Sequence, residues 1–351
     1  MVIIKESASE GEITWIKWLR VIACIMVVCL HSLPAGELST ESRYLYYCVI
    51  AVTRPCVPLF LMITGFLLLR KQKTEIDAEL FWKKRIPRVL YPLLIWGVIY
   101  AVLAYAYNKA EFSTLIYTLV LLPVRYPQEI GGILWYLYTL IGIYLFLPYL
   151  SPKTWTNRYY SSIFIGIWCI ASFFTFLRDW DSTLLCGTTA YNYDVLLNFS
   201  GLLGYLILGC ILGESNIHIP SIRLILISIA VFITGIVLFF SGMLVNHTGF
   251  IMTAYHMSFY SLPAILTAAS IFLIISKLKW GGGKIISLLS KLSFQIYLCH
   301  MVIYTVATRY LYLLSQSPII IICVMCSTFI GATGLAWLLN KAPYHKYITG
   351  A

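Results

Sequence analysis

The chain has 351 residues, of which 60% are hydrophobic, 15% aromatic and only 11% charged. Soluble globular proteins are nearer half apolar and a quarter charged, so this composition excludes a soluble enzyme, a disordered protein and an ordinary nucleic-acid binder. A helix of about 20 apolar residues crosses a bilayer, and the chain has room for about ten to twelve such helices. The net charge of +11 needs no anionic partner, because Lys and Arg are expected in the cytoplasmic loops of membrane proteins.

Ten apolar segments, separated by turn-rich or charged connectors, follow one another along the chain. They cover residues 14–33, 44–69, 88–107, 131–150, 160–178, 195–213, 222–245, 255–276, 292–313 and 318–340. We therefore expect an all-α polytopic membrane protein with about ten transmembrane helices, surrounded by membrane lipids. No internal repeat is visible and no connector is long enough to separate domains, so residues 1–351 are expected to form a single integral membrane domain.

The basic residues predict the orientation of these segments. If both termini are cytoplasmic, 18 of the 25 Lys and Arg residues fall on the cytoplasmic side and 5 on the opposite side, with Arg20 and Arg54 inside segments. Such an excess of positive charge is typical of cytoplasmic loops. The sequence therefore predicts an even number of spans with both termini in the cytoplasm.

Ionisable side chains inside a bilayer are costly and indicate function by default. The sequence offers few such candidates: Arg20 and His31 in the first segment, Arg54 in the second and His300 in the ninth. Arg20 and His31 are eleven residues apart, so on a helix they project from one face, about 16 Å apart along the axis. The alternative interpretation gives neither residue a catalytic role. Arg20 then extends its side chain to the cytoplasmic headgroups, and His31 merely ends the span.

Several blocks, in the same order, resemble the acyltransferase-3 family of bacterial membrane acyltransferases. The first is WIKWLRVIACIMVVCLHS, which contains Arg20 and His31. The others are RPCVPLFLMITGFLL from Arg54, KKRIPR from Lys83 to Arg88, LWYLYTLIGIYLFLPYL from Leu134, and LSFQIYLCH ending at His300. Relatives often carry His just before the Leu-Trp of the fourth block, where this chain has Ile133.

The resemblance implies acyl transfer across the inner (cytoplasmic) membrane of a cell. The donor is expected to be cytoplasmic acetyl-CoA, or another acyl-CoA, acting as co-substrate, with no cofactor bound permanently. The acceptor is expected to be a carbohydrate or lipid-linked sugar. A sugar hydroxyl is a poor nucleophile and needs a base with a pKa near neutrality, a role that fits His31. The sequence leaves open the alternative that His31 carries the acyl group transiently.

The remaining candidate residues have roles in binding or in charge stabilisation. Arg20 and Arg54 would hold the donor or stabilise charge in the transition state, although Arg54 could also serve an ion pair or carbonyl contacts inside the bundle. Arg85 and Arg88 would bind the CoA phosphates through charge-assisted hydrogen bonds, although topology alone favours basic residues there. Glu129 would orient the His31 imidazole, as the carboxylate of a catalytic triad does, or would simply be solvated in its loop.

His300 and Trp135 are possible additional site residues. The alternative is a structural role for both residues: His300 would be a hydrogen-bonded packing residue, and Trp135 would lie at the membrane interface. No metal site is expected, because His and carboxylates never cluster at ligand spacing. The alternative functional class is a polytopic glycolipid transporter or flippase without acyl-transfer activity. Paired inverted repeats would favour that class, and the sequence shows no such repeats.

Overall fold

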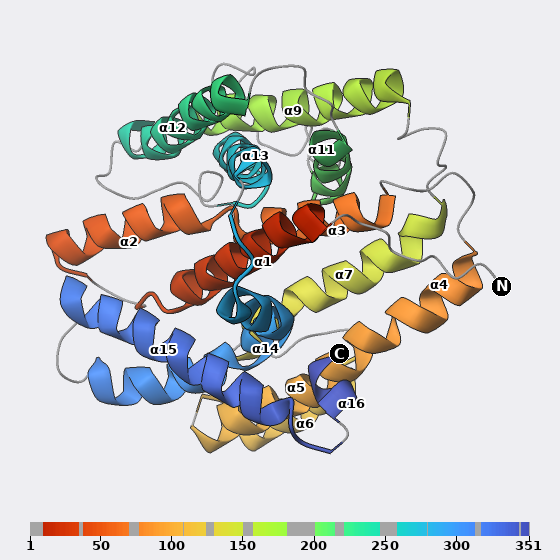
Figure 1. The fold of residues 1–351 in the computed structure, drawn as a ribbon. Helices are drawn as coiled ribbons and strands as arrows, with labels where there is room; N and C mark the ends of the chain where they lie inside the picture. Colours follow the sequence, from red (N-terminus) through yellow and green to blue (C-terminus); the bar gives the residue numbers. More distant parts are fainter. Residues whose placement is uncertain are drawn as a thin grey trace. The chain divides into compact units, whose positions relative to one another are not determined.

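The structure is a computed structural model, and it describes the chain in twelve ranges. These are residues 10–34, 38–69, 77–107, 109–123, 130–149, 157–180, 201–214, 221–245, 258–278, 280–312, 317–343 and 345–350. Every regular element in these ranges is a helix (Figure 1), which confirms the expected all-α class.

The chain groups into two compact units, each described here by itself. The first consists of residues 1–30, 47–73 and 152–290, and the second of residues 31–46, 74–151 and 291–351. The single domain expected from the sequence stays a prediction.

The helices follow the apolar segments closely. They are α1 (Glu10–His31), α2 (Thr40–Thr53), α3 (Cys56–Leu69), α4 (Ala78–Arg85), α5 (Pro87–Ala106), α6 (Phe112–Leu121), η1 (Gly131–Leu134), α7 (Trp135–Phe146), η2 (Leu147–Tyr149), α9 (Arg158–Trp180), α11 (Leu203–Glu214), α12 (Ser221–Val245), α13 (Leu262–Lys277), α14 (Lys284–Leu311), α15 (Pro318–Leu339) and α16 (His345–Thr349). Each of the ten expected segments overlaps at least one of these helices. The expected starts at residues 195 and 255 lie outside the described residues.

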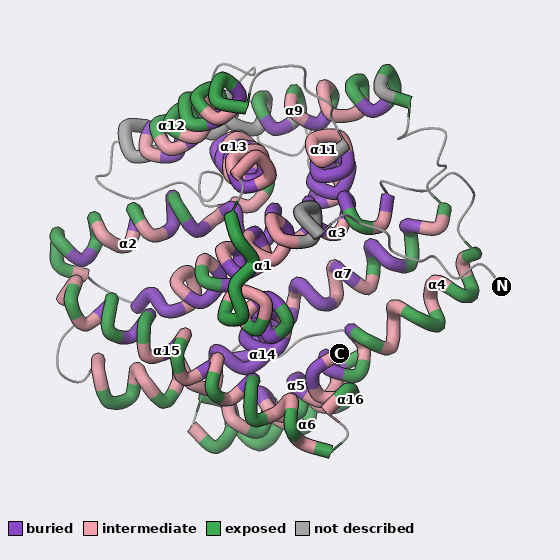
Figure 2. The backbone as a smooth tube through the Cα atoms, viewed as in Figure 1, coloured by how far each residue is buried: buried purple, intermediate pink, exposed green. Residues whose placement is uncertain are grey.

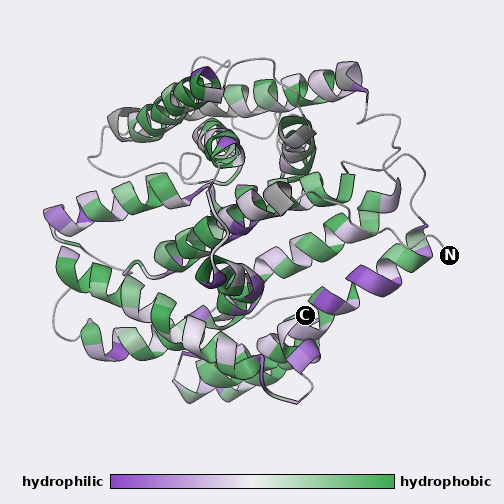
Figure 3. Cartoon of the chain, viewed as in Figure 1, coloured by the Kyte–Doolittle hydropathy of each residue, from purple (hydrophilic) through white to green (hydrophobic). Residues whose placement is uncertain are grey.

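Seven helical stretches are long and apolar enough to cross a membrane. They are Thr14–His31, Thr40–Leu69, Ala78–Ala106, Gly131–Tyr149, Ser221–Ser241, Lys284–Leu311 and Pro318–Leu339. Four apolar helices are shorter: Phe112–Leu121, Tyr159–Ile170, Leu203–Gly213 and Leu262–Lys277. The apolar character of these helices is visible in Figure 3. A polytopic helical protein is thus confirmed, while the count of ten spans and the side of each terminus stay predictions.

Two helix breaks coincide with prolines. The second expected segment breaks at Arg54 and Pro55, between α2 and α3. A further helix, α4, precedes the third segment and ends at Arg85, two residues before Pro87 begins α5. Proline has no backbone N–H and cannot donate the hydrogen bond that continues a helix. Each break therefore brings an arginine, Arg54 or Arg85, next to a helix end.

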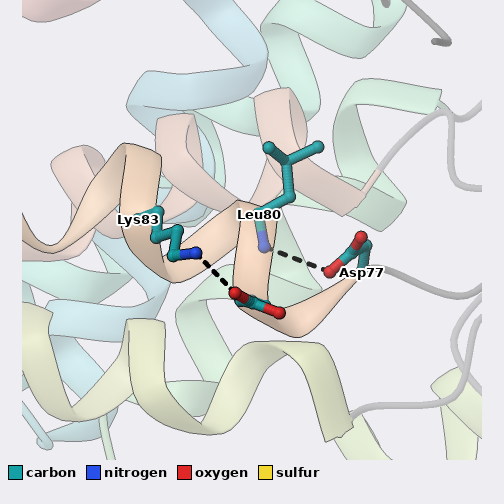
Figure 4. A network of polar contacts seen from close by, with 4 residues as sticks. Asp77, Leu80 and Lys83 are labelled. Carbon is teal, nitrogen blue, oxygen red and sulfur yellow. Dashed lines mark hydrogen bonds and ion pairs between the residues drawn. The ribbon is translucent and has the colours of Figure 1, made fainter.

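Helix α4 is short, charged and capped by its own sequence. The Asp77 side chain accepts a hydrogen bond of 3.1 Å from the Leu80 backbone N–H, an N-cap interaction (Figure 4). Lys83 pairs with Glu79 one turn earlier, but both side chains are exposed, so this pair contributes little to stability. The Lys and Arg residues in the last turn are favourable there because the helix C-terminus carries partial negative charge.

Glycines allow α11 and α3 to pack closely in the first unit. A Cβ atom on Gly65 would lie 1.9 Å from the Leu206 carbonyl oxygen, and one on Gly209 would lie 2.2 Å from the Met62 carbonyl oxygen. Apolar side chains gain little by leaving lipid for another helix, so membrane helices associate through close packing at such small residues. This contact forms part of the buried core of α3 (Figure 2).

An aromatic cluster holds α1 in the same unit. The Trp15 ring lies 5.1 Å from the Phe66 ring and 5.3 Å from the Phe272 ring, centroid to centroid. One turn further along, the Trp18 indole N–H donates a 3.1 Å hydrogen bond to the Gly281 carbonyl. These contacts tie α1 to α3, to α13 and to the connector that precedes α14.

In the second unit, buried aromatic side chains satisfy backbone carbonyls. The Tyr100 hydroxyl donates to the Leu298 carbonyl, and the Trp82 indole N–H donates to the Tyr144 carbonyl at 2.9 Å. A polar group in an apolar interior is costly unless it is paired. The apolar bodies of these side chains fill the core while their polar tips join one helix to the next.

The last helix, α16, lies against the first half of α5. The Trp96 indole N–H donates a 3.0 Å hydrogen bond to the Ile348 carbonyl, and the Tyr91 and Tyr347 rings meet edge to face, 5.2 Å apart. Gly350 follows with φ of +68°, and a Cβ atom there would lie 2.3 Å from the Arg88 carbonyl oxygen. Both the backbone conformation and the close approach thus require glycine.

Candidate active site

His31 is the last residue of α1, and the local sequence explains why the helix stops there. Ser32 and Leu33 form a turn, and Pro34 follows; proline disfavours the helical conformation of the residue before it. His31 is half-buried.

His300, in the middle of α14, lies beside His31 in the second unit. The two ring centroids are 5.5 Å apart, with an angle of 47° between the ring planes. The sequence singled out both residues but did not pair them. The structure thus brings these two predicted site residues together through a ring contact.

The surroundings of His300 define its tautomer. Its side chain is fully buried, and Nδ1 lies 2.7 Å from the Tyr297 carbonyl oxygen. A carbonyl can only accept, so Nδ1 carries the hydrogen and Nε2 of the neutral ring is left as an acceptor. Nε2 has no hydrogen-bond partner among the described residues. The structure therefore presents a buried, unused proton acceptor next to His31.

A run of aromatic rings extends from His300 to Trp135. The Tyr297 ring lies 6.1 Å from His300 and 5.9 Å from Tyr136, and the Tyr136 ring lies 6.2 Å from Trp135. The Tyr297 hydroxyl also donates to the carbonyl of Ile133, the position where relatives often carry His. Trp135 therefore belongs to the same packed region as His300, although its ring does not contact the imidazole directly.

Two tyrosines, Tyr304 of α14 and Tyr312 directly after its last residue, contact the chain directly after His31. The Tyr312 hydroxyl donates to the Ser32 carbonyl at 2.8 Å, and the Tyr304 hydroxyl donates to the Leu33 carbonyl at 3.1 Å. Sequence reasoning missed both residues. The available signal was the presence of tyrosines in and just beyond an apolar span, since a hydroxyl in such a place requires a partner.

Arg20 and Arg54 lie in the first unit. Helix α1 is continuous from Glu10 to His31, so Arg20 shares one helix with His31, as expected. The Arg54 guanidinium lies over the Phe259 ring, 4.6 Å from its centroid, which is a cation–π geometry. Both arginine side chains are half-buried. Glu129 lies outside the described residues.

Arg85 and Arg88 flank the break between α4 and α5 in the second unit. Arg85 is half-buried and Arg88 is exposed. Neither forms a hydrogen bond or an ion pair with the residues that the structure describes. Two guanidinium groups with no protein partner, three residues apart, are suited to an anionic ligand.

The described residues offer no set of side chains that could bind a metal ion. Within the described ranges, no three His, Cys, Asp or Glu side chains come close enough together to hold a metal ion. The expectation that no metal is used stays a prediction.

These features define a multi-pass membrane protein with a paired histidine site and with two arginines at a helix break that have no polar partner among the described residues. The acyltransferase-3 family, described as an acyltransferase domain, matches residues 13–337. The chain therefore belongs to this family, and it is a membrane acyltransferase. No curated protein and no solved structure shows significant similarity to the chain.

Proposed function

We propose that the protein is a membrane O-acyltransferase of the inner (cytoplasmic) membrane. It moves an acetyl group, or another short acyl group, from cytoplasmic acyl-CoA to a hydroxyl of an extracytoplasmic cell-surface glycan or glycolipid. Within the family, we expect the greatest functional similarity to the enterobacterial common antigen O-acetyltransferase. The observation that carries the proposal is the His31–His300 pair in a chain of this family.

In the proposed reaction, His31 acts as the general base. It accepts the proton of the acceptor hydroxyl while the hydroxyl oxygen attacks the thioester carbonyl carbon. The new C–O bond forms, the C–S bond breaks, and the CoA thiolate leaves and takes the proton from the His31 imidazolium. Positioned base catalysis of this kind contributes about 10²–10⁴-fold to a rate.

His300 supports this step through its free Nε2. When His31 is protonated, its ring becomes a donor on both nitrogens, and an acceptor in the neighbouring ring can bind and orient it. Trp135, at the far end of the aromatic run, offers a flat apolar surface of the kind on which a sugar ring can stack.

The arginines serve the donor in this proposal. Arg85 and Arg88 hold the phosphates of CoA at the cytoplasmic edge, where their side chains have no protein partner in the described part of the chain. Arg20 and Arg54 hold the donor or stabilise the charge that develops in the transition state. Glu129 keeps its proposed role beside the imidazole of His31.

The test uses membranes from cells that express the full chain, supplied with acetyl-CoA labelled in the acetyl group. We expect label in cell-envelope material that mild base releases, because O-esters are base-labile. His31→Ala should lower this transfer by about 10²–10⁴-fold. His345→Ala, a histidine on α16 away from the site, should leave it unchanged.

Two results would contradict the proposal. Transfer by His31→Ala at the wild-type rate, with equal protein in the membrane, would remove the catalytic assignment. Absence of base-labile label in wild-type membranes, together with transbilayer movement of a glycolipid, would favour the transporter class instead. Rapid trapping of a labelled His31 side chain would show that His31 carries the acyl group rather than acting as a base.

A further inference from the structure

The segment that follows His31 is held by hydrogen bonds from α14 and from the residue directly after it. Tyr312 donates to the Ser32 carbonyl at 2.8 Å and Tyr304 donates to the Leu33 carbonyl at 3.1 Å. Ser32 is 0% exposed and Leu33 is 9% exposed. Buried carbonyls beyond the end of a helix have no intrahelical partner and need a donor from elsewhere.

The two tyrosines approach this segment from different positions, Tyr304 within α14 and Tyr312 directly after its last residue. They are eight residues apart, so their Cα atoms are separated by about 12 Å along the axis. Their hydroxyls nevertheless reach the carbonyls of adjacent residues. The two side chains therefore converge on one peptide segment. Together they fix where this segment lies along the axis of α14 and how far it lies from the helix.

The same helix also carries His300. Tyr304 lies one turn after His300, and the His300 ring lies 5.5 Å from the His31 ring. Helix α14 thus provides one member of the histidine pair directly. The hydroxyls of Tyr304, on this helix, and of Tyr312, just beyond its end, anchor the backbone of the other member. A change in either hydrogen bond alters the placement of His31 without touching its side chain.

We propose that Tyr304 and Tyr312 are positioning residues that hold the His31 imidazole against His300 for the transfer step. This inference rests on the proposed role of His31 as the catalytic base. Misplacement of a reacting group by about 1 Å can lower a rate about 10²-fold, so two hydrogen bonds to the adjoining backbone are sufficient to matter. Burial raises the pKa of the Tyr312 hydroxyl above its ordinary value, and this hydroxyl accordingly remains a donor at neutral pH.

The test compares Tyr304→Phe, Tyr312→Phe and the double variant with wild type. Phenylalanine keeps the ring and removes only the hydroxyl. Tyr310→Phe is the matched control, because Tyr310 lies on the same helix with 67% of its side chain exposed. The measurements are the maximal rate of labelled acetyl transfer per mole of enzyme, the KM for acetyl-CoA, and the thermal midpoint of each purified variant.

We expect each single variant to lose about tenfold in maximal rate and the double variant about 10²-fold, with the KM for acetyl-CoA within about twofold of wild type. The control should retain the wild-type rate. A purely structural role would instead lower the thermal midpoint and the amount of folded protein while leaving the rate per folded enzyme unchanged. Each single variant keeps the other hydrogen bond. If the double variant does not accumulate in the membrane, the rates of the two single variants test the proposal.

A double-mutant cycle separates this proposal from the proposed function. In the His31→Ala background, Tyr312→Phe should cause no further loss of the residual rate, because the tyrosine acts only through His31. If His31→Ala is inactive but Tyr312→Phe behaves like Tyr310→Phe, the positioning role is wrong and the catalytic assignment stands. If His31→Ala is fully active, the catalytic assignment itself is wrong.

Discussion

Removal of Arg85 or Arg88 should weaken donor binding without slowing the chemical step. A hydrogen bond to a charged group contributes about 1.5–3 kcal/mol, which corresponds to roughly 10- to 150-fold in affinity. Solvent screens an exposed contact more strongly than a buried one. The exposed Arg88 should therefore fall at the lower end of this range and the half-buried Arg85 towards the upper end. Arg85→Ala is accordingly expected to raise the KM for acetyl-CoA more than Arg88→Ala does.

The assay measures the KM and the maximal rate of labelled acetyl transfer with two donors. Acetyl-CoA contains the nucleotide phosphates, whereas acetyl-pantetheine lacks them. The arginine variants should show a raised KM with acetyl-CoA and a much smaller change with acetyl-pantetheine. Lys84→Ala is the matched control, because it removes one exposed positive charge from the same turn of α4.

Two results would refute this reasoning. The first is a strong fall in the maximal rate of Arg88→Ala with unchanged KM, which would indicate a structural or transition-state role. The second is an equal rise in KM for Lys84→Ala, which would indicate that only the general positive charge of α4 attracts the donor.

Three other predictions concern catalysis, topology and packing. His31→Ala should lose about 10²–10⁴-fold in transfer while inserting normally, as measured by membrane fractionation and size-exclusion chromatography. Thr74→Cys should react with a membrane-impermeant thiol reagent only from the cytoplasmic side, and labelling from the opposite side would contradict the charge-based topology. Gly65→Ala should destabilise the protein by about 1–3 kcal/mol, because the added Cβ would overlap the Leu206 carbonyl. Gly142→Ala is the control, because the space around its added Cβ is open, and it should not lower the thermal midpoint of unfolding.

Hydropathy was sufficient to predict the class of fold, because a bilayer requires long apolar helices. It was less informative about shorter elements. Helix α6 (Phe112–Leu121) was missed because its ten residues are too few to cross a membrane. Helix α4 was missed because the Asp77 cap and the basic residues in its last turn lower the hydropathy of this stretch.

The candidate site was predictable in its residues but not in its arrangement. The cost of ionisable groups in a bilayer was enough to single out His31 and His300 one by one. Their pairing depends on how α14 packs against the end of α1, and sequence spacing within either helix carries no information about that contact. The tyrosine hydroxyls that hold Ser32 and Leu33 bind backbone carbonyls, and a carbonyl acceptor has no signature in the side-chain sequence.

The packing of α16 on α5 affects how the protein should be handled in experiments. Gly350 lies against the backbone of Arg88, one of the proposed donor-binding arginines, so a purification tag or reporter joined after it emerges at the start of α5. Such a fusion would crowd the α4–α5 break and could change the apparent donor affinity of an otherwise unaltered enzyme. Kinetic comparisons are therefore best made with the tag at the N-terminus, or with a cleavable C-terminal tag removed before the assay.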